Sequence, residues 1–291
     1  MSGIKDKLSS FGTFCYNSEE GKVLGRGGRN WAEIGLFYLI YYICLAGVFV
    51  GFLAIFYQTV DEARPKLTGT DSLLKGNPGM GFQPMTDVEY TLIRFRKPLL
   101  SYEPHKKSIM KVLKPYKDAA DKGVPCDMNN PPPEGESCRV DYANLTAECN
   151  EENSFGYRDQ NPCVLMRLNR IFEWMPQPYT EENVKNSGAS EELQAKILEN
   201  PNMIYIDCTG ENPADRDNLG EIKYYPTQGY PHYYYPFTNQ KDYMSPLVFV
   251  QFPNVAKNIA LMVECKALAP NINYDRTEKE GGVHFELLID P

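Results

Sequence analysis

The longest apolar run in the chain extends from Ile34 to Val60, which is 27 consecutive residues without Asp, Glu, Lys or Arg. A helix of this length, at ~1.5 Å per residue, would be about 40 Å long, more than the roughly 30 Å hydrocarbon core of a bilayer requires. A cleaved signal peptide has a shorter apolar stretch, of about 7–15 residues, at the extreme N-terminus. A buried helix of a soluble protein would carry polar positions on one face. The run therefore predicts a transmembrane helix.

After this span the pattern changes to the alternation that is typical of β-strands. Apolar and polar residues alternate over residues 283–290 and over 259–265, and residues 247–252 form a β-branched and aromatic run. Residues 203–208 and 163–172 predict further strands. Several strands separated by irregular segments predict a β-sandwich enlarged by insertions.

Three other segments break this alternation. Residues 101–121 have apolar residues at helical spacing, but Pro115 interrupts them and predicts a short or kinked helix. Ser190 is a good N-cap for a second short helix that stops at Pro201. Residues 61–85 are punctuated by glycine and proline and predict an extended stalk.

The chain is therefore expected to be mainly β after one N-terminal transmembrane helix. Its predicted parts are a tail (1–33), the transmembrane helix (34–60), a stalk (61–85) and a β-domain (86–291). The tail carries a formal charge of +1 and residues 61–291 carry −9, which gives the net charge of −8. The mean hydropathy of −0.45 is thus an average over two unlike parts. The acidic balance argues against a nucleic-acid partner, because such proteins carry a basic domain or stripe.

The cysteines and one sequon indicate on which side of the membrane the β-domain lies. Counting basic residues is indecisive, because they flank both ends of the span. Asn144-Leu-Thr146 is the only Asn-x-Ser/Thr sequon, and it predicts N-glycosylation of Asn144. Six of the eight cysteines follow the span: Cys126, Cys138, Cys149, Cys163, Cys208 and Cys265. Both features suit an oxidising compartment, so we expect a type II protein with its tail in the cytoplasm and its β-domain outside.

Six cysteines allow 15 disulfide pairings, and their spacing does not choose between them. In the chain-entropy description, closing the loop between Cys208 and Cys265 would stabilise the fold by about 4 kcal/mol, and closing a loop of about 12 residues by about 3 kcal/mol. Cys208 and Cys265 both lie on predicted strands, as a bridge between two sheets would require. Buried free thiols are the alternative.

Few residues are arranged for catalysis. The three histidines, His105, His232 and His284, are isolated from one another and lack metal-ligand spacing, and His284 is expected to be solvated on its strand. No Gly-x-Ser-x-Gly, His-Glu-x-x-His or P-loop motif occurs. The glycine-rich turn with Arg26 and Arg29 is expected to be flexible and to meet anionic headgroups of the membrane lipid. The sequence therefore argues against an enzyme.

The predicted span has two opposed faces. At about 100° per residue, Tyr38 and Tyr42 share one face, whereas Gly47, Gly51 and Ala54 cluster on the opposite one. Small residues allow another helix to approach closely, and a phenol hydroxyl surrounded by lipid alone would lack a partner. The alternative is a chance Gly-x-x-x-Gly spacing with Tyr38 at the membrane interface. Two opposed faces in one span favour contacts with other helices.

Residues 224–243 contain seven tyrosines, Phe237 and three prolines. Aromatic side chains supply a large contact area, and prolines lower the entropic cost of ordering a segment on binding. The segment either fills the core of the β-domain or forms a surface for a partner. Because seven tyrosines in 20 residues exceed what a core usually absorbs, we favour the partner surface.

Short motifs have the order and spacing of one known family along most of the chain. In the tail and span they are Tyr16-Asn17-Ser18-Glu19, Leu24-Gly25-Arg26-x-Gly28-x-x-Trp31 and Phe37-Tyr38-x-x-Tyr41-Tyr42-x-Cys44-Leu45-Ala46-Gly47. In the β-domain they are Leu168-Asn169-Arg170, Cys208-Thr209-Gly210, Tyr234-Tyr235-Pro236, Pro246-Leu247, Gln251-Phe252 and Glu264-Cys265-Lys266-Ala267. With these motifs the chain resembles the β subunits of the sodium/potassium-transporting P-type ATPase.

The resemblance implies a non-catalytic subunit that assembles with the ten-span catalytic α subunit. Such a subunit supports maturation and plasma-membrane delivery of the α subunit and modulates potassium affinity and occlusion. Na⁺, K⁺, Mg²⁺ and ATP would bind the α subunit, and this chain would hold no cofactor. The resemblance further implies an immunoglobulin-like sandwich whose disulfides join neighbours in sequence, namely Cys126–Cys138, Cys149–Cys163 and Cys208–Cys265.

Contact residues are implied as well. Tyr38 and Tyr42 match the tyrosine pair that faces the seventh span of the α subunit. The segment that matches an outer contact with an extracellular loop of the α subunit consists of Tyr234, Tyr235, Pro236 and Phe237. The glycine face would be open to a small single-span regulatory subunit, and Cys44 matches a cysteine that is redox-modified in the family.

Three other functions are compatible with the topology. One is the β subunit of the related proton/potassium pump. Another is a cell-adhesion glycoprotein that acts through the sandwich. A third is a type II ectoenzyme such as a glycosyltransferase, although no catalytic constellation supports it.

Overall fold

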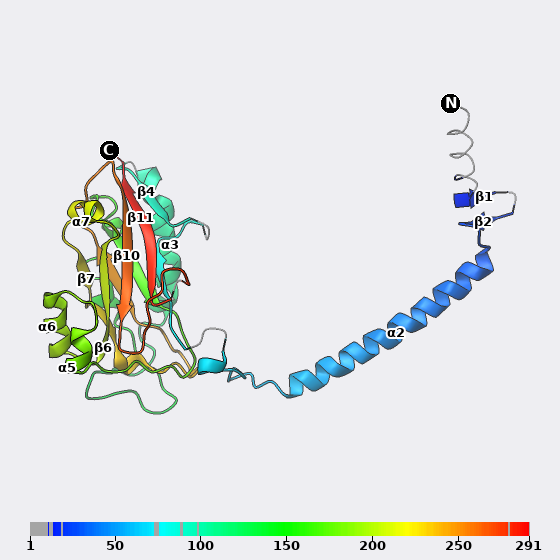
Figure 1. The fold of residues 1–291 in the computed structure, drawn as a ribbon, viewed down its shortest axis with the longest axis horizontal. Helices are drawn as coiled ribbons and strands as arrows, with labels where there is room; N and C mark the ends of the chain where they lie inside the picture. The colour runs from blue at the N-terminus through cyan, green and yellow to red at the C-terminus, as the bar shows by residue number, and fades with distance from the viewer. Residues whose placement is uncertain are drawn as a thin grey trace. The chain divides into compact units, whose positions relative to one another are not determined.

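The computed structural model separates the chain into two compact units, Met1–Glu62 and Ala63–Pro291 (Figure 1). We describe each unit by itself. The structure describes residues 11, 14–18, 20–72, 76–87, 90–97, 99–278 and 280–290.

The first unit consists of a short hairpin followed by a long helix, α2 (Gly28–Gln58). The hairpin pairs β1 (Tyr16–Asn17) with β2 (Lys22–Val23). The backbones of Val23 and Arg26 exchange two hydrogen bonds of 3.0 Å. The indole Nε1 of Trp31, in the first turns of α2, donates to the Val23 carbonyl at 2.9 Å. The turn before the span, expected to be flexible, is therefore held by hydrogen bonds on both sides.

Helix α2 begins six residues before the apolar run that predicted it. Its 31 residues correspond to about 46 Å at ~1.5 Å per residue. The Nε of Arg29 lies 3.1 Å from Oε1 of Glu33, an i,i+4 ion pair that extends the helix into polar sequence. The most apolar window has a mean hydropathy of 2.5, and no residue of α2 is buried within the chain. The predicted spanning helix is thus present.

The second unit is built from two sheets (Figure 1). The five-stranded sheet has the order β4 (Leu92–Phe95), β11 (Gly282–Ile289), β10 (Ala260–Leu268), β6 (Met203–Gly210) and β8 (Gly229–Pro231). The four-stranded sheet has the order β3 (Met80–Gln83), β5 (Cys163–Leu168), β9 (Leu247–Gln251) and β7 (Lys223–Tyr225). Neighbouring strands are antiparallel except for β4 and β11, which pair in parallel.

The hydrophobic core lies between these two sheets. The rings of Phe82 on β3 and Phe285 on β11 stack with centroids 5.1 Å apart, so the two sheets are in direct contact. On β10, Leu261 and Val263 are fully buried while Met262 between them is exposed, which is the alternation of a strand with one face inward. The mainly β fold with a predicted sandwich is confirmed.

Short helices lie in the connections. Ser190 caps α6 (Glu191–Glu199) as predicted, because its Oγ accepts from the Leu193 amide at 3.3 Å. Helix α3 (Leu99–Asp118) has 20 residues and continues through Pro115, so the prediction of a short helix is wrong. Its buried face compensates for the lost hydrogen bond, since Ile109 is fully buried in the core. The others are α4 (Tyr142–Leu145), α5 (Glu181–Lys185), α7 (Pro213–Leu219), η1 (Gly69–Asp71), η2 (Ser154–Gly156) and η3 (His232–Tyr234).

The predicted stalk is too long. Residues 80–83 of the range 61–85 form β3, and Met80 and Phe82 are buried in the core. The glycines and prolines around this strand concealed its short alternation. Gly81 faces the Arg167 side chain of the neighbouring strand, and an added Cβ would lie 3.2 Å from the Arg167 Nε.

Three disulfides join Cys126 to Cys138, Cys149 to Cys163 and Cys208 to Cys265, the pairs between neighbours in sequence. Cys208 on β6 and Cys265 on β10 are directly opposed in adjacent antiparallel strands, with their Cα atoms 4.0 Å apart. The expectation of a bridge between the two sheets is therefore wrong, because this disulfide lies within one sheet.

Loop length predicts unequal contributions of the disulfides to stability. Removing the Cys208–Cys265 bridge, which spans 57 residues, with Cys208→Ala and Cys265→Ala should lower the free energy of unfolding by about 4 kcal/mol. Removing the Cys126–Cys138 bridge, which spans 12 residues, should lower it by about 3 kcal/mol. Urea unfolding followed by Trp174 fluorescence measures both. The opposite order of losses would contradict the loop-length argument.

Candidate partner-binding surfaces

The tyrosine face of α2 is exposed within the first unit. Tyr38 and Tyr42 are 50% and 59% exposed, and their rings stack with centroids 6.2 Å apart. Neither hydroxyl forms a hydrogen bond to any residue that the structure describes. A polar group in the hydrocarbon region of a membrane needs a partner, because no water is present there. The pair therefore presents one rigid aromatic surface with two unmet hydroxyls.

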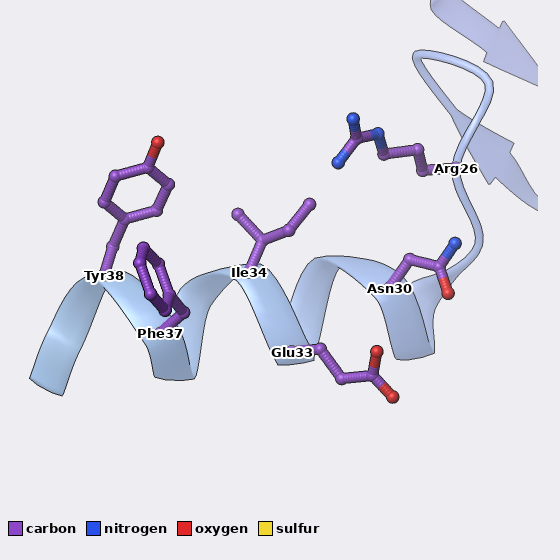
Figure 2. Close-up of a pocket in the computed structure, with 6 residues that line it drawn as sticks. All are labelled: Arg26, Asn30, Glu33, Ile34, Phe37 and Tyr38. Atoms are coloured by element: carbon purple, nitrogen blue, oxygen red, sulfur yellow. The ribbon is translucent and has the colours of Figure 1, made fainter. Parts of the chain in front are cut away.

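A groove extends this face toward the start of the helix. It is lined by Arg26, Asn30, Glu33, Ile34, Phe37 and Tyr38. Figure 2 shows Tyr38, Ile34 and the guanidinium of Arg26 on one side of the helix, with the Glu33 carboxylate turned away. The hydrogen-bonded turn at Val23 holds Arg26 over the groove. The groove thus combines an apolar floor with one cation at its polar end.

The glycine face lies about 180° from Tyr38 at ~100° per residue. A Cβ added to Gly47 or Gly51 would meet no atom within 4 Å. Packing within the chain therefore does not require glycine at either position. Ala54 continues this strip of small residues, and the exposed thiol of Cys44 lies about 20° from Gly51. The strip is free to accept a second helix at short distance.

The aromatic segment 224–243 differs from the expectation. Its aromatic residues are all buried or half-buried, with Tyr230 fully buried and Tyr243 8% exposed. The core therefore absorbs more tyrosines than was expected, because strands β7 and β8 place part of the segment against the sandwich. Burial raises the pKa of the Tyr230 and Tyr235 hydroxyls above their ordinary value.

The proposed outer contact residues are half-buried and held in place. The Tyr234 hydroxyl donates to the Arg139 carbonyl at 3.3 Å, and the Tyr235 ring packs edge-on against Trp174 at 5.7 Å. Pro236 follows in the same half-buried run. The Arg170 guanidinium lies 5.6 Å from the centre of the Phe237 ring. The segment is thus a rigid shelf with partly accessible aromatic edges.

A hollow of about 380 Å³ adjoins Phe237 and Arg170. Asn239, at its rim, donates through Nδ2 to the Ala63 carbonyl at 3.4 Å. Ala63 follows the last residue of α2 by five residues. This bond fastens the segment that leaves the spanning helix to the loop after the aromatic shelf.

The histidines have structural surroundings. Buried His105 donates through Nε2 to the Arg94 carbonyl at 2.9 Å. His232 is also buried, and its Nε2 has no partner within the described residues. His284 lies on strand β11 with its side chain 35% exposed, and its Nδ1 lies 2.8 Å from Glu211 Oε1. Within the described part of the chain, no group of three His, Cys, Asp or Glu side chains could hold a metal ion.

One long apolar helix and one disulfide-bonded β-sandwich define a single-pass membrane protein with a large folded domain outside the bilayer core. The family described as "Sodium / potassium ATPase beta chain" matches residues 2–285. The chain is 37% identical to the sodium/potassium-transporting ATPase subunit beta-2 of Drosophila melanogaster, with 98% of this chain and 94% of the relative covered. It is 27% identical to human subunit beta-2, with 95% and 93% covered. The chain belongs to the sodium/potassium ATPase beta chain family.

Buried histidines make the stability of the β-domain depend on pH. Desolvation lowers the pKa of His232 to about 4 from its ordinary value of 6.5, and it also lowers that of His105. The unfolded chain therefore binds the proton more readily, and stability is lost as the pH falls from 6.5 toward 4. We expect His232→Asn to lose less unfolding free energy than the native chain between about pH 7 and pH 5. Urea titrations at each pH test this, and parallel losses would contradict it.

Proposed function

We propose that the chain is the non-catalytic β subunit of a sodium/potassium-transporting P-type ATPase and that it assembles with a catalytic α subunit. The observation that carries this proposal is the exposed tyrosine face of α2. Its two hydroxyls lack partners in the chain, and the relatives are named as subunits of this pump. A partner helix that supplies hydrogen-bond acceptors would satisfy this face.

The proposal includes an orientation. The tail lies in the cytoplasm, and the β-domain lies outside the cell at the plasma membrane. Three disulfides in the second unit and the exposed sequon residue Asn144 support this assignment, because both chemistries belong to the secretory pathway. On the cytoplasmic side, Arg26 and Arg29 would meet anionic lipid headgroups.

The proposed contacts with the α subunit fall on both units. Tyr38 and Tyr42 pack on a membrane helix of the α subunit. Tyr234, Tyr235, Pro236 and Phe237 contact one of its extracellular loops. The rigid shelf suits this role because its side chains are ordered before binding, which lowers the entropic cost of association.

The same proposal assigns the transport chemistry to the partner. Na⁺, K⁺, Mg²⁺ and ATP bind the α subunit, and this chain supports its maturation and tunes its potassium affinity and occlusion. Two observables separate this role from that of an enzyme. The chain should co-purify from membranes with a large ATPase subunit, and the purified chain alone should not hydrolyse ATP. Recovery of the mature chain without a partner on native gels would overturn the proposal.

The tyrosine face can be tested directly. We expect Tyr38→Ala with Tyr42→Ala to weaken the complex or shift the apparent potassium affinity, because two aromatic surfaces and two hydroxyls are lost. Each such contact is worth about 1 kcal/mol, so a change of roughly fivefold or more is expected. The measurements are co-purification in detergent and potassium activation of ATPase activity.

A matched control is available on the same helix. Tyr41→Ala with Val48→Ala truncates side chains that lie about 80° and 100° from the midpoint between Tyr38 and Tyr42, at ~100° per residue. This control should assemble and respond to potassium like the native chain. Equal behaviour of the two double variants would reject the tyrosine face.

The glycine face gives a separate prediction. Gly47→Leu with Gly51→Leu should leave α2 intact, because leucine is a good helix former and an added Cβ meets nothing at either position. We expect these variants to retain the α subunit but to lose a small single-span protein from the purified complex. Leu39→Phe with Val50→Phe adds bulk outside both faces and serves as the control. Retention of the small protein would contradict the assignment of this face.

A further inference from the structure

A small hollow in the β-domain lies beside the one sequon. Its volume is about 140 Å³, and its lining includes Asn144, Pro226, Pro231, Tyr233 and Tyr234. At ~30 Å³ per water molecule, this space would hold four or five waters. An acetamido group, with four non-hydrogen atoms, is of the same size. The hollow is thus too small for a folded partner and large enough for part of a sugar.

The rim residue is held in a fixed position. Asn144 lies in α4. The Asp141 side chain caps this helix by accepting a hydrogen bond from the backbone N–H of Asn144 at 3.0 Å. The next residue, Leu145, is 1% exposed and anchors this turn in the core. The side chain of Asn144 is exposed and forms no hydrogen bond to the described residues. Its Nδ2 atom is therefore available at the edge of the hollow.

The walls have the chemistry that sugars use. The rings of Tyr233 and Tyr234 lie 4.7 Å apart at 38° and form a continuous aromatic surface. The hydrogen bond from Tyr234 to the Arg139 carbonyl holds this surface in place. The rings of Pro226 and Pro231 add further apolar surface to the lining. The C–H face of a pyranose ring packs on such a wall, while its hydroxyls stay in water.

We propose that an N-linked glycan on Asn144 packs its first N-acetylglucosamine on this hollow, with the acetamido group inside. The inference rests on the outward orientation in the proposed function. The transfer joins Nδ2 of Asn144 to C1 of the sugar, with loss of one amide proton. It breaks the bond from C1 to the diphosphate of a lipid-linked oligosaccharide, which leaves as the lipid diphosphate. The glycan is then a fixed part of the surface.

Packing of the first sugar has a measurable consequence. A peptide N-glycosidase is an amidase that hydrolyses the bond between Cγ and Nδ2 of the glycosylated asparagine, so it must reach the base of that sugar at Asn144. The native complex should therefore release the Asn144 glycan slowly, although the denatured chain releases it readily. The matched control moves the glycan to an exposed site on the same domain. Thr146→Ala removes the native sequon, and Ala260→Thr creates one at Asn258, where residues 258–260 are exposed.

The experiment uses the full chain co-expressed with its α subunit in cells that add N-glycans. Peptide N-glycosidase treatment of the native complex is followed by gel mobility. We expect release from Asn144 to be about tenfold slower than release from Asn258, equivalent to about 1.4 kcal/mol of packing. Tyr233→Ala should bring the Asn144 rate close to the Asn258 rate. If that variant fails to fold, the comparison of the two sites still decides.

The outcomes separate this inference from the proposed function. Equal release rates at the two sites would overturn the packed glycan, and so would glycosylation of the control variant at Asn258 when the native chain carries no glycan at Asn144. Either result leaves assembly with the α subunit intact. A chain glycosylated at neither site would instead overturn the outward orientation, and with it this inference.

Discussion

The main physical constraint on this protein is an apolar helix, α2, that no other part of the described chain covers. No residue of α2 is buried, although the helix is among the most apolar parts of the sequence. In lipid the backbone hydrogen bonds of a helix are all made within the helix. Contacts with neighbouring helices therefore depend on the side chains and on the space that small residues leave. The stacked tyrosines and the strip of small residues lie on opposite sides of this helix. Under the proposed function, each side would contact a different neighbouring helix.

The β-domain meets a different constraint. Its two sheets enclose one core, and contacts within the domain hold the side chains of its aromatic shelf in place. The Arg170 guanidinium over the Phe237 ring and the hydrogen bond from Tyr234 to the Arg139 carbonyl restrain side chains that would otherwise rotate freely. Side chains that are ordered before binding lower the entropic cost of association without any increase in the contact area.

Much of the fold follows from local pattern, and the errors have a common cause. The run from Ile34 to Val60 and the alternation on β10 and β11 depend on neighbouring residues alone, and both predictions are confirmed. Strand β3 was missed because its glycines and prolines resemble a stalk, and its burial depends on β5, over 80 residues away. The sheet that holds Cys208 and Cys265, and the burial of Tyr230, are likewise decided by distant strand pairing. On α2, local periodicity alone places the tyrosines and the small residues on opposite sides, and their contacts with other helices stay a prediction.

The parallel pairing of β4 with β11 constrains when the domain can fold. Strand β11 follows every other described strand in the chain, yet it lies between β4 and β10 inside the sheet. The hydrogen bond from Thr91 to Glu286 joins residues 195 positions apart. Contacts of such long range form late, because the loop between them must close first. The ribosome must therefore deliver residues 282–289 before the sandwich can close, and until then β4 and β10 each offer an open edge to chaperones.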